Sequence, residues 1–148
     1  MKTNKIVIDL LKQIYKNKDV MRIMYGFEGD YIYLSPDGYV GYKIPNKDFF
    51  IDMKKAVPDR VPIENIVKKY LNDKNHEDAF LTNDIKKVDK VKCTAIKISN
   101  DKTCVWVNEK FLKEFDKDCT FKILSPKSPI FIYENEEMAG FVMPIKID

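Results

Sequence analysis

Short apolar runs separated by tight-turn residues constrain the fold of this chain more than any other feature. The runs at residues 21–27, 31–34, 39–44 and 49–53 are each long enough only for a strand. A Ser-Pro-Asp-Gly turn at residues 35–38 divides the second run from the third, because proline fixes the first turn position and glycine accepts a positive φ. We therefore expect an antiparallel meander in this part of the chain.

Two segments before residue 75 have apolar residues at helical spacing. In residues 4–16, Ile6, Leu10 and Ile14 share one face, and Thr3 or Asn4 is suited to cap the start. A second helix is expected from Pro62, because proline is well tolerated in a first turn and an apolar stripe follows it up to Leu71. Residues 54–61 lie between the fourth run and this helix and are expected to form a connector.

The rest of the chain is expected to contain further helices and strands. Thr82-Asn83-Asp84 is interpreted as the cap of a short helix, and Asn108 as the cap of another over residues 109–116. Strands are expected at 93–98, 103–107, 120–124, 129–133 and 139–147, with turns at 100–101 and 134–137. A helix followed by strands thus occurs roughly twice. The predicted class is α+β: two amphipathic helices on antiparallel sheets, with a helical insert at about 62–90.

Composition narrows the functional classes. With 148 residues and 17.4 kDa, the chain is expected to form a single domain, 1–148. The 26 basic and 23 acidic residues leave a net charge of +3, too small by itself to establish nucleic-acid binding. No apolar run reaches the length of a membrane span, and residues 1–30 show no secretory signal pattern, so we expect a cytoplasmic protein that does not bind membranes.

Chemistry-bearing residues are scarce, so we expect no catalytic residues, no metal site and no cofactor. The single histidine, His76, cannot supply a typical zinc set, and the three cysteines form no C-x-x-C pair. A cysteine nucleophile would need His76 beside Cys93 or Cys104, but both cysteines lie in apolar strand patterns and are expected to be buried. None of the five glycines forms a phosphate-binding motif. The protein is therefore predicted not to be an enzyme.

Three motifs in the last third resemble one protein family. They are Val-Trp-Val-Asn-Glu-Lys-Phe-Leu at 105–112, Ser-Pro-Ile-Phe-Ile at 128–132 and Phe-Val-Met-Pro-Ile-Lys-Ile at 141–147. In this order and at these distances they resemble the entry to the last helix and the two following strands of bacterial sliding clamps, the β subunit of DNA polymerase III. Residues 34–40 are similar to a strand and turn in the same family. The resemblance implies a single clamp-like domain.

The resemblance gives two rows of lysines a possible function. In each of the two expected helices the lysines lie on one face: Lys5, Lys12 and Lys16 in the first, and Lys110, Lys113 and Lys117 in the second. In a clamp-like fold the two helices lie side by side on the concave surface, where these lysines would contact the phosphates of double-stranded DNA without reading sequence. The alternative is that each row is only the solvated face of its helix.

The resemblance also implies a site for partner proteins. In bacterial clamps the C-terminal strand helps to form an apolar pocket that receives short linear motifs of replication and repair proteins. Met143, Pro144 and Ile145 occupy the matching positions. A flexible methionine suits a pocket that accepts several ligands. The alternative is that this strand only packs against the core, with Pro144 marking a sheet edge.

Two functional hypotheses follow. The first is a non-enzymatic, DNA-clamp-like protein that acts in DNA replication or repair by binding DNA, clamp-binding motifs of replication proteins, or both. Such a protein could assemble into a homo-oligomer. The second is a small α+β protein-interaction module without DNA binding, for example an accessory factor of a mobile element. The segment 62–90 separates them: in a clamp it should lie outside the core, and in an unrelated module it should complete the core.

Overall fold

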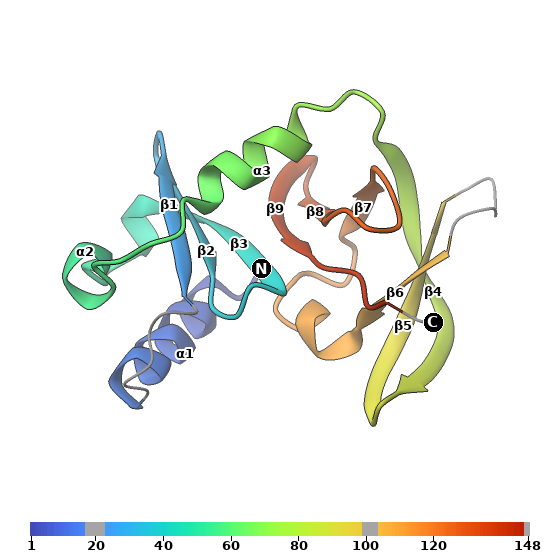
Figure 1. Ribbon diagram of the computed structural model, residues 1–148, viewed down its shortest axis with the longest axis horizontal. Helices are drawn as coiled ribbons and strands as arrows, with labels where there is room; N and C mark the ends of the chain where they lie inside the picture. Colours follow the sequence, from blue (N-terminus) through green and yellow to red (C-terminus); the bar gives the residue numbers. More distant parts are fainter. Residues whose placement is uncertain (17–22, 99–103, 147–148) are drawn as a thin grey trace.

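The computed structural model describes residues 1–16, 23–98 and 104–146, and only the backbone of residues 97 and 98. Within these ranges the chain has an α+β fold (Figure 1). The helices are α1 (Thr3–Lys16), α2 (Met53–Ala56) and α3 (Ile63–Leu71), with 3₁₀ turns η1 (Asn46–Asp48) and η2 (Glu109–Leu112). The strands are β1 (Met24–Glu28), β2 (Tyr31–Ser35), β3 (Val40–Pro45), β4 (Glu77–Val88), β5 (Val91–Ile98), β6 (Cys104–Asn108), β7 (Thr120–Ile123), β8 (Ile130–Glu134) and β9 (Glu137–Val142).

All described strands join one antiparallel sheet in the order β1-β2-β3-β9-β8-β7-β4-β5-β6. Six of these strands form two three-stranded meanders, β1-β2-β3 and β7-β8-β9, which meet where β3 pairs with β9. Each meander follows a helical element, α1 in the first half and η2 in the second. The predicted plan of a helix followed by strands, used twice, holds for the first half, whereas in the second half the 3₁₀ turn η2 stands in place of the helix. The β3–β9 pair joins the two halves.

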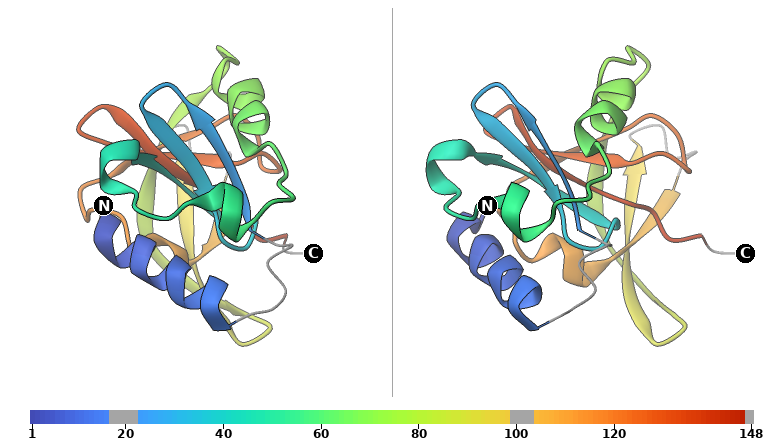
Figure 2. Two further views of the ribbon diagram at one scale, coloured as in Figure 1. Left: turned by 90° about the vertical axis from the view of Figure 1, so that its left-hand side faces the viewer. Right: turned by 60° about the vertical axis from the view of Figure 1, so that its left-hand side comes forward.

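Side chains alternate between the two faces of this sheet, and both faces are covered. On β8, Ile130 and Ile132 belong to the main core cluster, whereas Phe131 between them belongs to a second cluster. The main cluster receives Ile6, Val7 and Leu10 of α1, and the second receives Ile63 and Val67 of α3. Accordingly, Figure 2 shows α1 and α3 on opposite sides of the meanders. The two helices predicted with apolar stripes at 4–16 and from Pro62 are confirmed.

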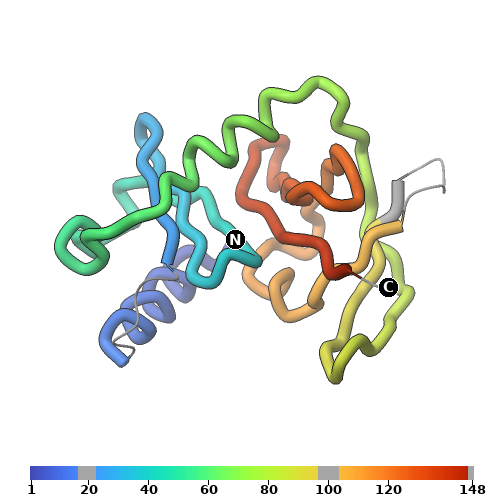
Figure 3. The backbone as a smooth tube through the Cα atoms, in the orientation of Figure 1, coloured from blue at the N-terminus to red at the C-terminus, as the bar shows by residue number. Residues whose placement is uncertain are grey.

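The far end of the sheet curls back toward the seam between the halves. After β9, the Met143 amide donates to the Tyr39 carbonyl at 2.8 Å, and the Ile145 amide donates to the Trp106 carbonyl at 2.7 Å. The second bond forms a bridge between the C-terminal tail and β6 (Figure 3). The last regular strand therefore ends at Val142 rather than extending to residue 147, which itself lies outside the described residues.

Three sequence predictions of secondary structure are wrong. Residues 49–53 form no strand, because Asp52 begins the short helix α2 and its side chain accepts a bond from the Lys55 amide at 3.4 Å. The helix expected after Thr82 is instead a β-hairpin of β4 and β5, whose turn residues Asp89 and Lys90 both have positive φ. Pairing of β4 with β5 on either side of residues 82–84 thus overrides the local capping signal.

The helix expected over residues 109–116 is only the single 3₁₀ turn η2. Its predicted cap is confirmed, because Asn108 Oδ1 accepts a bond from the Lys110 amide at 3.1 Å. Phe115 is buried against Tyr42 with ring centroids 5.4 Å apart, so the chain turns toward the sheet instead of continuing as a helix. The turn predicted at residues 100–101 and the first residue of the strand predicted at 103–107 lie outside the described residues.

Candidate functional site: an apolar cavity between α3 and the sheet

An apolar cavity of about 210 Å³ opens between α3 and the sheet. An apolar space of roughly 150 Å³ already admits a benzene ring, so this cavity is large enough for one big apolar side chain. Its walls come from four parts of the chain: α3, the start of β1, the turn before β3, and the β8–β9 region. The lining residues are Met24, Gly38, Ile63, Ile66, Val67, Tyr70, Pro129, Phe131, Phe141 and Met143.

The helix α3 supplies one wall of the cavity because the sheet covers only part of its apolar stripe. Ile63 and Val67 are fully buried against the sheet. Ile66 lines the cavity but remains 43% exposed, and Tyr70 is half-buried at the other end of the same wall. The Ile66 side chain therefore extends the apolar lining of the cavity to the molecular surface.

The floor of the cavity lies where β3 and β9, the strands that join the two halves, pack closely together. Phe131 and Phe141 are buried on the α3 side of the sheet. The Phe141 ring lies directly over Gly41, where a Cβ atom would lie 2.1 Å from Phe141 Cε1. Only glycine permits this approach, so Gly41 is required for the position of the Phe141 ring.

Met143 reaches the cavity because backbone bonds hold both ends of its segment. Its amide bond to the Tyr39 carbonyl places it next to the turn at 35–38. In that turn Gly38 has φ +81° and its amide donates to Ser35 Oγ at 2.9 Å, as the Ser-Pro-Asp-Gly signal predicts. Gly38 also leaves room for Met24, whose Cε would lie 3.4 Å from a Cβ atom there. Two flexible thioethers, those of Met24 and Met143, therefore line the cavity.

The other two predicted partner-binding residues lie elsewhere. Pro144 and Ile145 follow Met143 but are not among the residues that line the cavity. Ile145 instead forms the bridge to Trp106 of β6. The structure therefore places one of the three predicted residues at the cavity. The α3 residues of the wall were missed because helical spacing shows that Ile66 belongs to an apolar stripe but not that the sheet leaves it uncovered.

Charged residues in α3 and just before it are paired with one another and with the edge of the sheet. Arg60 donates to Glu64 at 2.7 Å and to the Tyr25 carbonyl at 3.1 Å. Lys68 is 3.5 Å from Glu28, and burial together with the Glu28 carboxylate raises the pKa of Tyr33 to about 12. These pairs orient α3 over β1 and β2.

His76 is engaged in structure rather than in a nucleophile pair. Its Nε2 lies 2.7 Å from the Tyr70 carbonyl, and its ring packs edge-on against Phe131. Cys93 is buried as expected, whereas Cys104 is exposed, which corrects the prediction for that residue. Burial raises the pKa of Cys119 to about 11, which keeps that thiol protonated and unreactive near neutral pH. In the described ranges no cluster of three or more metal-ligating side chains is found.

The six predicted DNA-contacting lysines do not form one free cationic strip. Lys5 is paired with both Asp9 and Glu114, and the two partners raise its pKa. The Nζ of Lys110 lies 4.9 Å from the centre of the Phe111 ring. Four of the six are exposed and have no ion pair among the described residues: Lys12, Lys16, Lys113 and Lys117.

The two lysine-bearing segments do lie next to each other. The Lys2 amide donates to the Glu114 carbonyl at 2.8 Å, which joins the start of α1 to the chain after η2. Between them lies a more open cavity of about 250 Å³ with three carboxylates, those of Asp9, Asp37 and Glu114. Burial and these same three carboxylates raise the pKa of Tyr42. The surface between the rows is therefore rich in negative charge.

Comparison with known proteins gives no match: no family model, curated protein or solved structure is significantly similar to this chain. The relationship to sliding clamps inferred from the three C-terminal motifs therefore stays a prediction. Within the part of the chain that the structure describes, no helix is long and apolar enough to cross a membrane.

Proposed function

We propose that this chain is a non-enzymatic, clamp-like binding module that acts in DNA replication or repair by receiving a short apolar segment of a partner protein in the cavity beneath α3. The observation that carries the proposal is the position of Met143. The resemblance implies that this residue helps to form a pocket for linear motifs, and Met143 lines the largely apolar cavity next to α3.

The chemistry of the cavity supports binding rather than catalysis. Its lining is aliphatic, aromatic and thioether, and Tyr70 is the one titratable residue among the lining residues. Binding of an apolar side chain there would remove the exposed Ile66 from water, at about 25 cal/mol per Å² of apolar surface buried. The two methionines allow the walls to adapt to different aliphatic or aromatic side chains.

The alternative, an interaction module unrelated to clamps, shares this site. The segment 62–90 separates the two hypotheses only in part. Its helix α3 packs on the second cluster, whereas Ala79 of β4 belongs to the main core cluster. Integration of β4 into the sheet between β7 and β5 favours the unrelated module. Binding of an apolar segment under α3 is common to both hypotheses, so it is tested first.

The test uses the methionine methyl groups as internal reporters. We expect a hexapeptide that contains Leu-Phe, added to protein carrying ¹³C-labelled methionine methyls, to shift the signals of Met24 and Met143. Met53 lies buried in the main core and serves as the reference that should not move. A matched Ala-Ala peptide should shift neither signal. Equal shifts of Met24, Met53 and Met143, or no shift with either peptide, would contradict the proposal.

A pair of variants locates the binding surface. Ile66→Lys places a charge at the cavity mouth and should weaken peptide binding at least about tenfold, because a lysine there opposes apolar contact. Ile8→Lys makes the same change on α1 at nearly equal exposure, 45% against 43%, and should leave the affinity unchanged. Equal affinities of the two variants would place the peptide elsewhere.

DNA binding is a second candidate, favoured by the hydrogen bond that holds the two lysine-bearing segments together. We expect Lys12→Glu combined with Lys113→Glu to abolish retention of a labelled duplex and to flatten its salt dependence. Lys54→Glu with Lys55→Glu, an equal charge change on α2, is the control and should have a smaller effect. Unchanged retention and salt slope in the first variant would mean that these lysines are only solvated surface.

A further inference from the structure

The second cavity, of about 250 Å³, lies on the α1 side of the sheet and is separate from the cavity beneath α3. Its apolar walls are Ile6 and Leu10 of α1, Val40 of β3 and Phe111 of η2. An apolar space of roughly 150 Å³ already holds a benzene ring. The second cavity is therefore large enough for a short aliphatic stem together with a polar head group.

Two contacts tie α1 to the other walls of this cavity. Gln13 Nε2 donates to the Pro36 carbonyl at 3.2 Å, which joins the helix to the turn at 35–38. Lys5 is paired with Glu114, which joins the helix to the chain after η2. The walls are thus held in place without a ligand, and a preformed site costs less free energy to fill than one that must first be ordered.

The charged groups at the cavity do not balance. Three carboxylates line it, those of Asp9, Asp37 and Glu114. Lys110 is the one cation among the lining residues, and Lys5, outside the lining, is paired with both Asp9 and Glu114. Three carboxylates against two ammonium groups leave one negative charge. A ligand with a single positive charge would therefore neutralise the site.

Two of these carboxylates keep an oxygen without a partner in the part of the chain that the structure describes. Asp37 Oδ1 accepts from the amides of Tyr39 and Val40 at 2.9 and 3.2 Å, whereas its Oδ2 accepts no bond there. Glu114 Oε1 is paired with Lys5, whereas its Oε2 is buried and unpaired. A buried acceptor without a donor is costly, and a positive charge in the cavity would offset that cost.

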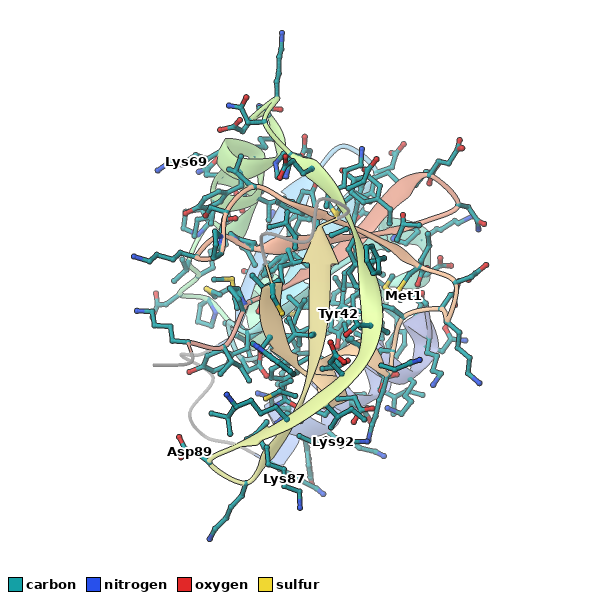
Figure 4. The ribbon with its side chains drawn as sticks, turned by 90° about the vertical axis from the view of Figure 1, so that its right-hand side faces the viewer. Met1, Tyr42, Lys69, Lys87, Asp89 and Lys92 are labelled. Atoms are coloured by element: carbon teal, nitrogen blue, oxygen red, sulfur yellow. The ribbon has the colours of Figure 1, made fainter. Side chains whose placement is uncertain are left out.

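The observation that points to a ligand is the hydroxyl of Tyr42. This residue lines the cavity, is only 7% exposed and lies near the middle of the molecule (Figure 4). Among the described residues its hydroxyl has no hydrogen-bond partner. Burial and the carboxylates of Glu114, Asp37 and Asp9 raise its pKa, so the hydroxyl faces the three acidic groups of the cavity. A buried tyrosine hydroxyl usually has a partner, and here the partner is missing inside an acidic cavity.

We propose that this cavity binds an organic cation made of a short aliphatic stem and one terminal ammonium group. The stem packs between Ile6, Leu10 and Val40, and the ammonium group donates to the Tyr42 hydroxyl oxygen and to Asp37. Apolar walls with a few convergent polar groups are typical of small-molecule sites. Such a cation comes either as a free alkylamine or as a lysine side chain of a partner chain, and the experiments distinguish these sources.

Two other kinds of cation suit the cavity less well. In the described ranges its carboxylates do not form a group that could hold a metal ion. A planar guanidinium prefers an open aromatic face. The Phe111 ring offers none, because it is stacked on Tyr39 with centroids 6.3 Å apart and has Lys110 Nζ 4.9 Å from its centre. A compact ammonium group needs no such face.

Methyl signals report on the two cavities separately. In protein with ¹³C-labelled isoleucine and valine methyls, we expect n-pentylamine to shift Ile6 and Val40, with a Kd of about 1 mM. Ile63 and Val67 are the same residue types at the cavity beneath α3 and should not move. n-Pentanol, which lacks the charge, and ammonium chloride, which lacks the stem, should each shift Ile6 and Val40 much less. This test does not depend on peptide binding beneath α3.

A peptide identifies the source of the cation. The probe is acetyl-Gly-Lys-Gly-amide, and its control carries norleucine in place of lysine, which keeps the stem and removes the charge. Binding of the lysine peptide at least about tenfold more tightly than n-pentylamine would identify a side chain of a partner protein. Binding of n-pentylamine as tightly as the lysine peptide, or more tightly, would identify a free amine. Norleucine binding equal to that of lysine would contradict the proposed role of the charge.

The variant Tyr42→Phe separates binding from stability. Removing a buried hydroxyl that has no partner should leave the free energy of unfolding unchanged or higher, whereas the affinity for n-pentylamine should fall at least about fivefold. Tyr25→Phe is the matched control, because the Tyr25 hydroxyl donates to the Val57 carbonyl at 3.0 Å. It should be less stable and bind like the parent chain. Asp37→Asn keeps the acceptor for the turn amides but loses the charge, and should weaken binding about tenfold.

Several results would overturn the proposal. One is the absence of a saturable shift of Ile6 or Val40 at roughly 20 mM n-pentylamine, well above the expected Kd. Another is an equal effect of n-pentanol, and a third is a Tyr42→Phe variant that loses stability but keeps its affinity. Shifts confined to Ile63 and Val67 would place the amine beneath α3 and would exclude the second cavity as its site.

Discussion

The two halves of the molecule follow the same path through the sheet but differ in their helical element. In the first half α1 has 14 residues and places Ile6, Val7 and Leu10 in the core. In the second half η2 has four residues, none of them buried, and Phe115 beyond it packs against Tyr42 in the same core cluster. The first half therefore covers the sheet with a helical stripe, whereas the second places an aromatic ring in the core from beyond a single turn.

This difference shows that the sheet, not the helix, is what the two halves share. β3 and β9 meet at the centre through Gly41 and Gly140, so the backbones of the two halves approach closely. The helical elements then cover whatever area their own side chains can fill. Two kinds of substitution test this comparison. One shortens an apolar side chain in the helical element of each half, and the other adds a methyl group where β3 meets β9.

The largest effect is expected from the helix contacts. Leu10→Ala in α1 should lower the free energy of unfolding by about 3 kcal/mol, because it leaves a cavity beneath a fully buried position. Leu112→Ala in η2 removes the same group from a half-buried position and should cost about 1 kcal/mol. Urea denaturation measures both. Equal costs would mean that the two helical elements contribute alike and that the contrast between the halves is wrong.

A smaller effect is expected at the seam. A Cβ atom on Gly140 would lie 2.2 Å from the Gly41 carbonyl oxygen and 2.8 Å from Phe115 Cζ. Backbone cannot move aside as a side chain does, so Gly140→Ala should cost about 2 kcal/mol. Gly29→Ala, at φ +56° with no atom within 4 Å of the added methyl, should cost only about 1 kcal/mol from backbone strain. A Gly140→Ala variant as stable as the parent chain would show that the halves are not tightly joined there.

The β4–β5 hairpin and the cavity are features that the sequence alone did not predict. Residues 82–84 have the composition of a helix cap, but the pairing of β4 with β5 before and after them makes this segment part of a strand. For the cavity, the sequence pointed to Met143 through a resemblance, but Ile66 and Met24 join it from distant segments. No local pattern reports which part of an apolar stripe the sheet leaves uncovered. Likewise, one of the two ion pairs of Lys5 is with Glu114, more than a hundred residues away.

What the sequence by itself determined is local. The apolar spacing of α1 and α3, the Ser-Pro-Asp-Gly turn at 35–38 and the alternating runs of the meanders follow from side-chain periodicity and from the φ preferences of proline and glycine. Only the tertiary structure decided that β3 meets β9, that β4 is a strand paired with β5, and that Met143 lines a cavity with α3. These features depend on long-range pairing and packing, whose free energy is distributed over residues that are far apart along the chain.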